Sequence, residues 1–137
     1  MAKKKTRHVN PEVLHALART EIRARIGGGA VVWRYTVLVP VQETKQGAAP
    51  QPLATDADQD ALEDTLATHF NGVTVLPEVP GFGLRKGRLE MNRSVPYVIY
   101  AAPLTASEEY FQALKKELQE ALVQETILVE RQDVWIL

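Results

Sequence analysis

The segment from residue 31 to residue 41 alternates between large apolar side chains and other residues. Its repeating apolar positions are Trp33, Tyr35, Val37, Val39 and Val41. A period of two places these side chains on one face of an extended chain, so the pattern predicts a half-buried β-strand. Residues 94–101 predict another apolar strand and residues 73–76 a short one. Residues 126–129 begin a last strand, which leads to the apolar terminus 134–137.

Two segments have the three- and four-residue spacing of amphipathic helices. The first covers residues 56–70, and the pair Asn71-Gly72 predicts its end because both residues tolerate the left-handed conformation. The second begins at Thr105, which forms a helix capping box pattern with Glu108. Its apolar stripe consists of Phe111, Leu114, Leu118, Ala121 and Leu122. Both helices are therefore expected to bury one face.

The segments 43–55 and 77–93 contain proline and glycine, and the first of them has no apolar period. This composition predicts long surface loops, with a strand extension only near residues 88–91. At the other end of the chain, residues 10–26 predict an amphipathic helix that starts at Asn10-Pro11-Glu12. The run 27–29 is three glycines, so residues 1–29 are expected to form a helical arm with a hinge.

After this arm the predicted elements follow the order β-α-β-β-α-β. Right-handed crossovers convert two such split βαβ halves into a four-stranded antiparallel sheet with both helices on one face. The sequence therefore predicts an α+β ferredoxin-like domain over residues 30–137, preceded by the arm over residues 1–29. In that plan the strands at residues 31–41 and 94–101 are central, in agreement with their apolar character.

Short motifs in the same region resemble a family of small uncharacterised bacterial proteins. They are Phe70-Asn71-Gly72-Val73-Thr74, then Pro80-Gly81-x-Gly83, and Gln124-Glu125-Thr126-Ile127-Leu128-Val129 near the end. In that family a helix ends in a Phe-Gly-Gly-Val-Thr type of turn, and a Gln-Glu pair opens the final strand. The resemblance covers roughly residues 36–137. It departs at Asn71, where the family pattern has glycine, and in the arm. It implies a ferredoxin-like fold and no activity, because none is assigned to the family.

Charge is distributed unevenly along the chain. Residues 1–26 contain seven of the 16 Lys and Arg residues and only two of the 17 Asp and Glu residues, so a basic arm precedes an acidic domain. Such an arm is more often a solvated tail than a binding segment, and an acidic protein surface or nucleic-acid phosphate would be its partner. The chain has no cysteine and no apolar run long enough for a signal peptide or a membrane span. We therefore expect a cytoplasmic protein without contact to a membrane.

One glycine-rich basic segment is the best ligand-binding hypothesis. It combines backbone freedom with three cationic side chains, a combination that can hold an anion: Gly81, Gly83, Arg85, Lys86 and Arg88. Nucleotide-binding loops join a strand to a helix, whereas this segment leads to another strand. An ordinary hairpin connection is therefore the favoured alternative.

Other candidate chemistry has simpler explanations. The acidic residues Asp56, Asp58 and Asp60 lack the glycine and glutamate of a calcium loop and fit a helix start instead. The three histidines, at positions 8, 15 and 69, show no metal-ligand spacing, so no metal and no cofactor are expected. Ser94 and Ser107 have no neighbouring base in the sequence. Glu78, Glu90 and Tyr97 could meet near the sheet as an acid and base set, but any such protein offers similar trios by chance.

Taken together, these features favour a noncatalytic interaction or regulatory protein that forms a homo-oligomer, most simply a dimer. The open sheet face and the apolar terminus supply the expected interface: Leu38, Tyr100, Trp135 and Ile136. One alternative is a small cofactorless enzyme with an active cleft at a dimer interface. Another is anion or nucleic-acid phosphate binding through the arm and the segment Gly81–Arg88. A closed pocket with a Tyr, His or Glu side chain would favour the enzyme.

Overall fold

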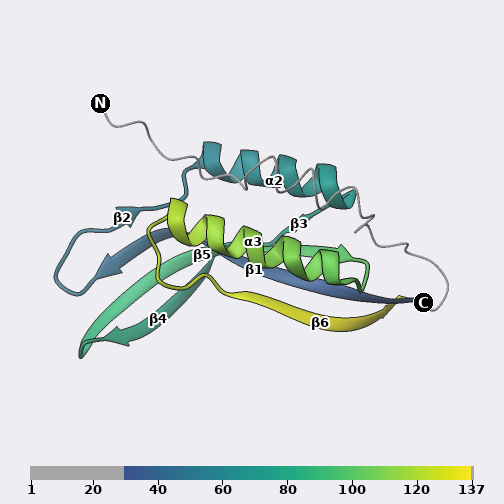
Figure 1. Cartoon of the computed structure of the whole chain (residues 1–137). Coiled ribbons are helices and arrows are strands. Elements are labelled where there is room, and N and C mark those ends of the chain that lie inside the picture. Colours follow the sequence, from purple (N-terminus) through teal and green to yellow (C-terminus); the bar gives the residue numbers. More distant parts are fainter. Residues whose placement is uncertain (1–29, 137) are drawn as a thin grey trace.

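Within the described residues, six antiparallel strands form one curled sheet, and two helices lie on one side of it (Figure 1). The computed structural model describes residues 30–136, so the expected helical arm and its hinge lie outside the described residues. The strands are β1 (Ala30–Lys45), β2 (Gln51–Pro52), β3 (Thr74–Val75), β4 (Val79–Arg85), β5 (Arg88–Ala101) and β6 (Val129–Ile136). The helices are α2 (Asp56–Phe70) and α3 (Thr105–Ala121).

The two long strands β1 and β5 occupy the centre of the sheet. They pair over almost their whole length, from Trp33 opposite Ala101 to Lys45 opposite Glu90. The outer edge of β1 is shared by β6, which pairs with residues 30–37, and by β2, which pairs near its end. The outer edge of β5 is shared in the same way by β3 and β4. Each central strand therefore carries two short neighbours along one edge.

This arrangement corrects the predicted ferredoxin-like plan of four strands. The strands β1 and β5 are 16 and 14 residues long, so they continue well beyond the part of the sheet that the helices cover. In Figure 1 this extension and β4 project past the helices as a twisted ribbon. The register between β1 and β5 shifts between Pro40 and Gln42, and such a bulge increases bending and twist. The result is a curled six-stranded sheet.

The two segments expected to be loops contain much of this extension. Residues 43–45 continue β1, and residues 51–52 return along it as β2. Residues 79–85 and 88–93 form a regular hairpin, β4–β5. Within residues 30–136 no helix covers either face of this hairpin, so its apolar side chains stay exposed. Its apolar residues do alternate with other residues along each strand, but the prolines and glycines within residues 77–87 outweigh that signal and favour a loop.

The helix boundaries follow from local chemistry. Helix α2 begins with a capping box in which the Thr55 side chain accepts from the Asp58 amide at 3.1 Å and Asp58 accepts from the Thr55 amide at 2.8 Å. It ends at Asn71, whose φ of 62° is left-handed, as predicted. Helix α3 begins at Thr105, but Leu104 occupies the N-cap and no side chain caps the helix. The predicted capping box at Thr105 is therefore wrong.

The core lies between the helices and the sheet. It contains an aromatic cluster in which the ring of Phe111 of α3 stacks on Tyr35 at a centroid distance of 3.8 Å and on Phe70 of α2 at 5.2 Å. Both helices and both central strands contribute further core residues, among them Val37, Val39, Leu62, Leu66, Tyr97, Ile99, Leu114 and Leu118. In residues 30–136 no helix is both long and apolar enough to cross a membrane.

Candidate functional site

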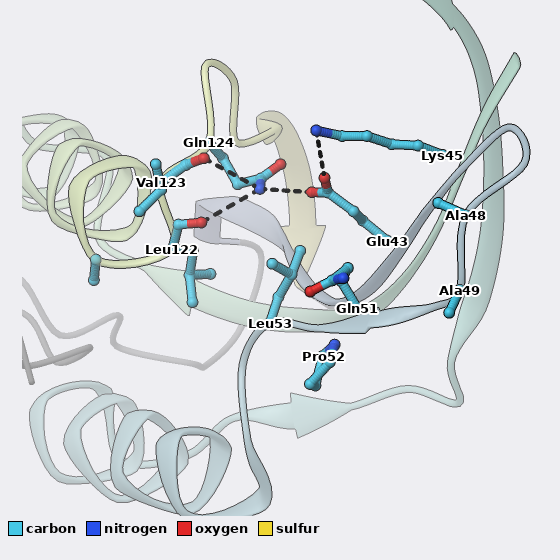
Figure 2. A pocket seen from close by; sticks show the side chains of 11 residues that line it. Glu43, Lys45, Ala48, Ala49, Gln51, Pro52, Leu53, Leu122, Val123 and Gln124 are labelled. Carbon is cyan, nitrogen blue, oxygen red and sulfur yellow. Dashed lines mark hydrogen bonds and ion pairs between the residues drawn. The ribbon is translucent and has the colours of Figure 1, made fainter. Parts of the chain in front are cut away.

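A hollow of about 450 Å³ lies where the end of β1, the β1–β2 connection and the end of α3 meet (Figure 2). One side of it is apolar and includes Pro52, Leu53 and Leu122. The other side carries the charged pair Glu43 and Lys45. The hollow therefore offers both apolar surface and charge to a small molecule.

The polar side of the hollow is organised around Glu43. Figure 2 shows Gln124 reaching from the end of α3 towards Glu43, and its Nε2 donates to Glu43 Oε2 at 3.0 Å. The same Nε2 lies 3.3 Å from the carbonyl oxygens of Leu122 and Val123. The Nζ of Lys45 lies 3.7 Å from the other oxygen, Glu43 Oε1. Both carboxylate oxygens of Glu43 are thus held in place by neighbouring side chains.

The chain that follows α3 is strained beside this hollow. Val123 has a φ of 52°, in the left-handed region that β-branched residues avoid, and its side chain is 87% exposed. The turn is held by hydrogen bonds from the amides of Val123 and Gln124 to the carbonyl oxygens of Glu120 and Gln119. Backbone strain kept at a surface turn is typical of functional sites, since the surrounding structure must compensate for it. Here the turn places Gln124 on Glu43.

Two further hollows adjoin the first. The second, of about 330 Å³, shares Glu43, Lys45 and Gln124 with it and adds Glu90 and Asn92 of β5. The third, of about 370 Å³, lies at the hairpin and is lined by Lys45, Gln46, Lys86, Arg88 and Glu90. We call the three together the end groove. Sheet register explains their continuity, because Lys45 is paired with Glu90 and Glu43 with Asn92.

The predicted anion-binding residues belong to the β4–β5 hairpin. Lys86 and Gly87 form its two-residue turn with φ values of 52° and 74°, which suits the right-handed twist of a hairpin. The favoured alternative, an ordinary hairpin connection, is therefore confirmed. Gly81 and Gly83 lie within β4, where they pair with Asn92 and Glu90, and Lys86 and Arg88 line the third hollow. Anion binding by Lys86 and Arg88 stays a prediction, whereas the backbone of Arg85 closes the turn opposite Arg88.

The residues predicted for an oligomer interface do not share one surface. Leu38 and Tyr100 are half-buried and lie on the same face of the sheet. Leu38 and Arg34, the residue paired with Tyr100, are both on the face of β1 opposite to the core residues Tyr35 and Val37. Trp135 is 66% exposed and pairs with Val31, which places it on the opposite face. The half-buried Ile136 is the next residue and points away from Trp135. The predicted interface residues therefore lie on two faces of the sheet, with Trp135 on one and the other three on the opposite one.

The acid and base set weighed from the sequence is not assembled. Tyr97 donates to Glu63 of α2 at 3.1 Å, whereas Glu78 is ion-paired with Arg93 at 2.6 Å. Only Glu90 reaches the end groove. The buried Ser107 donates to the carbonyl of Ala102 at 2.7 Å and has a structural role at the start of α3. Within residues 30–136 no three His, Asp or Glu side chains are grouped for a metal ion.

Sequence reasoning missed the residues at the centre of the end groove. Glu43, Lys45 and Gln46 lie in a segment predicted as a loop, so nothing marked them. The Gln124-Glu125 pair is part of a motif shared with the resembling family, but that motif indicates only the start of a strand. Gln124 contacts Glu43 across 81 positions of the chain, a distance over which no local pattern operates.

No family model matches this chain, and no curated protein matches it. Among solved structures, it is similar to a phage SAM lyase in complex with S-methyl-5'-thioadenosine, with 26% sequence identity and a TM-score of 0.50. That likeness covers 80% of this chain and 85% of the lyase chain. A phage SAM lyase in the apo state is 27% identical, with a TM-score of 0.45, over 82% of this chain and 86% of that one.

These comparisons correct two expectations. The resemblance to a bacterial ferredoxin-like family has no support from a family model, and the similarity found is to a phage protein. The expectation of a noncatalytic interaction or regulatory protein is wrong, because the similar solved structure is that of an enzyme. The alternative of a small enzyme agrees better with this likeness, which extends over most of both chains.

Proposed function

We propose that this protein is a small enzyme that cleaves SAM and releases S-methyl-5'-thioadenosine, and that the end groove is its active site. The observation that carries the proposal is the likeness to the phage SAM lyase in complex with S-methyl-5'-thioadenosine, which is 26% identical over 80% of this chain. Its placement in the end groove rests on the shape and charge of that groove.

The chemistry of the reaction defines what the site has to bind. SAM is a sulfonium cation with a nucleoside on one side and an amino acid chain, carrying an ammonium and a carboxylate, on the other. Release of S-methyl-5'-thioadenosine breaks the bond between sulfur and the amino acid chain, and both electrons of that bond stay on sulfur. The sulfur becomes neutral. In a lyase the carbon fragment makes its new bond with its own atoms rather than with water.

The apolar side of the groove suits the nucleoside. Pro52, Leu53 and Leu122 supply an apolar wall, and a hollow of about 450 Å³ falls in the size range of small-molecule sites. Ala48 and Ala49 of the β1–β2 connection also line the hollow, and their small side chains leave room for a ring next to the apolar wall. An adenine ring gains affinity from such a surface through burial of its flat faces.

The carboxylates of the groove suit the cations of SAM. Glu43 lies beside the apolar wall, and its side chain is only 24% exposed. Gln124 and Lys45 orient its carboxylate. Glu90 lines the adjoining hollow next to Lys45. A carboxylate held in a partly buried position interacts with a cation more strongly than one in bulk water. Glu43 is therefore assigned to the sulfonium end and Glu90 to the ammonium.

Direct assay of the purified protein tests the proposal. Incubation with SAM should release S-methyl-5'-thioadenosine, measured by liquid chromatography, and mass spectrometry of the remaining four-carbon product identifies the new bond. The variant Glu43→Gln keeps the size of the side chain and removes its charge, so kcat/KM should fall about 10- to 100-fold, the worth of a hydrogen bond to a charged group.

The matched control is Glu109→Gln, which removes the same charge from an exposed position on α3 away from the groove residues. It should retain the rate of the unaltered protein. Absence of S-methyl-5'-thioadenosine formation by the unaltered protein would overturn the proposed activity. Equal rates for Glu43→Gln and Glu109→Gln would instead move the active site away from the end groove.

A further inference from the structure

The third hollow of the end groove has a strongly basic lining. Three of its five residues are cationic, Lys45, Lys86 and Arg88, while Glu90 is the one carboxylate and Gln46 the one amide. We call it the basic hollow. Its volume of about 370 Å³ is large enough for a carboxylate and the atoms that carry it. A net positive hollow of this kind favours an anionic group.

The basic hollow is built on a rigid framework. Gln46 is fastened to the hairpin twice, because its amide donates to the Leu89 carbonyl at 3.0 Å and its Oε1 accepts from the Leu89 amide at 3.1 Å. The second of these bonds leaves Nε2 of Gln46 as a donor. The tight turn at Lys86 and Gly87 fixes the backbone position of Arg88, the first residue of β5. The cationic side chains therefore start from well-defined backbone positions.

Two of the three cations have no anionic partner in the described part of the chain. Neither Lys86 nor Arg88 takes part in an ion pair within residues 30–136, and both are exposed. Lys45, by contrast, lies 3.7 Å from Glu43. Arg88 can hold a carboxylate with two parallel hydrogen bonds, which makes it the strongest donor for such a ligand. The basic hollow thus has unused capacity for an anion.

Its position relative to the rest of the groove matches the layout of an amino acid. Lys45 and Glu90 line both the basic hollow and the second hollow, and Glu43 lines the first two. Carboxylates therefore lie directly next to cations along the groove. An amino acid carries its ammonium and carboxylate on the same carbon atom, so it needs groups of both charges side by side.

We infer that the basic hollow binds the α-carboxylate of the substrate through Arg88, Lys86 and Lys45, and so sets the direction in which SAM lies in the groove. The inference rests on the proposed function and extends it. The nucleoside lies against the apolar wall at Leu53 and Leu122, and the amino acid end lies at the hairpin. The hairpin thereby distinguishes SAM from nucleosides that lack a carboxylate.

Stopped-flow binding of three nucleosides, recorded before SAM is cleaved, tests this orientation. SAM carries the carboxylate, decarboxylated SAM keeps the sulfonium and the ammonium, and S-methyl-5'-thioadenosine lacks the whole chain. In Arg88→Ala the Kd of SAM should rise about tenfold, from loss of charge-assisted hydrogen bonds. The Kd values of the other two nucleosides should stay within about twofold of the unaltered protein, which is the spread expected for surface substitutions.

A second variant keeps the test independent of any local distortion. Lys86→Gly removes a cation at a position whose φ of 52° favours glycine, so the turn is preserved. It should also weaken SAM alone. The matched control Lys116→Ala removes one positive charge from the exposed surface of α3 and should alter none of the three affinities.

The possible failures have different signatures. Equal weakening of SAM and decarboxylated SAM in Arg88→Ala would overturn the carboxylate assignment and leave the proposed activity intact. Unchanged binding of SAM in both Arg88→Ala and Lys86→Gly would overturn it as well. Failure of the unaltered protein to bind any of the three nucleosides would overturn the proposed function and this inference together.

Discussion

Three tyrosines carry their hydroxyl groups into or beside the core. Tyr35 donates to Glu108 at 2.9 Å, Tyr97 donates to Glu63 at 3.1 Å, and the hydroxyl of the buried Tyr110 has no hydrogen-bond partner among the described residues. Burial raises the pKa of all three, and the neighbouring carboxylates raise it further for Tyr35 and Tyr97. The folded protein therefore holds these three protons more tightly than the unfolded chain does.

This difference predicts the alkaline limit of stability. The contribution of such a tyrosine to the free energy of unfolding is fully present below the pKa of about 10 that tyrosine has in the unfolded chain. It is lost as the pH rises above that value, because the unfolded chain then gives up its proton first. Replacing Tyr110 by Phe removes one of these groups. The free energy of unfolding of Tyr110→Phe should therefore fall less steeply with pH, by up to about 1.4 kcal/mol per pH unit.

Urea unfolding measured at several pH values between 9 and 12 supplies the two curves for this comparison. At neutral pH the Tyr110→Phe variant should be at least as stable as the unaltered protein, because the lost hydroxyl has no partner within residues 30–136. Curves that run parallel throughout the alkaline range would contradict a buried, neutral Tyr110 phenol.

At the scale of elements, the two helices differ in how they begin. The capping box of α2 satisfies the amide of Asp58 through the Thr55 side chain, whereas Leu104 at the N-cap of α3 supplies no side-chain acceptor. Helix α3 instead depends on the contacts of its buried residues, such as Phe111 and Leu114, with the sheet. The same substitution should therefore have unequal effects at the two helix starts.

Thr55→Ala should lower the free energy of unfolding by about 1 kcal/mol, the usual worth of an N-cap side chain. Thr105→Ala is the matched control. It changes the first residue of α3, which caps nothing, and should cost no more than about 0.5 kcal/mol, as for other surface substitutions. Chemical denaturation at neutral pH measures both. A loss at Thr105 equal to that at Thr55 would show that the capping pattern with Glu108 operates after all.

At the scale of the whole molecule, the apolar surface of the hairpin has no covering element within residues 30–136. Phe82 faces Met91 and Leu84 faces Leu89 across the two strands, so the four side chains share one face. All four are exposed, Phe82 by 68% and Leu84 by 77%. Exposed apolar surface of this kind marks an interaction site, and we propose that a second copy of the chain covers it in a homo-oligomer.

Light scattering of the protein at micromolar concentration should give a mass above that of one chain. Phe82→Asp should reduce this mass to that of the monomer, because it places a charge in the centre of the apolar face. Trp135→Asp changes the exposed apolar residue on β6 and should leave the oligomer intact. A monomeric mass for the unaltered protein would exclude self-association, and dissociation by Trp135→Asp alone would move the interface to β6.

The sequence by itself determined the helices and the buried half of the sheet. Helix α2 was predicted with its observed bounds because Leu62, Leu66 and Phe70 repeat with helical spacing and Asn71 tolerates the left-handed conformation. The core strands were equally clear, since Tyr35 and Val37 alternate with partly exposed residues. These signals are local: a helix or a half-buried strand imposes its period on neighbouring residues, so a short stretch of sequence suffices to reveal it.

Only the tertiary structure decided the full sheet and the end groove. The extension formed by β4 and the ends of β1 and β5 is held by pairing between strands, and no helix within residues 30–136 covers it, so few of its positions are buried. The groove joins Glu43 to Gln124 and Gln46 to Leu89, pairs that lie 81 and 43 positions apart. Such contacts depend on the bend at residues 40–42 and on where α3 ends. These are properties of the packed chain, and no segment of the sequence contains them alone.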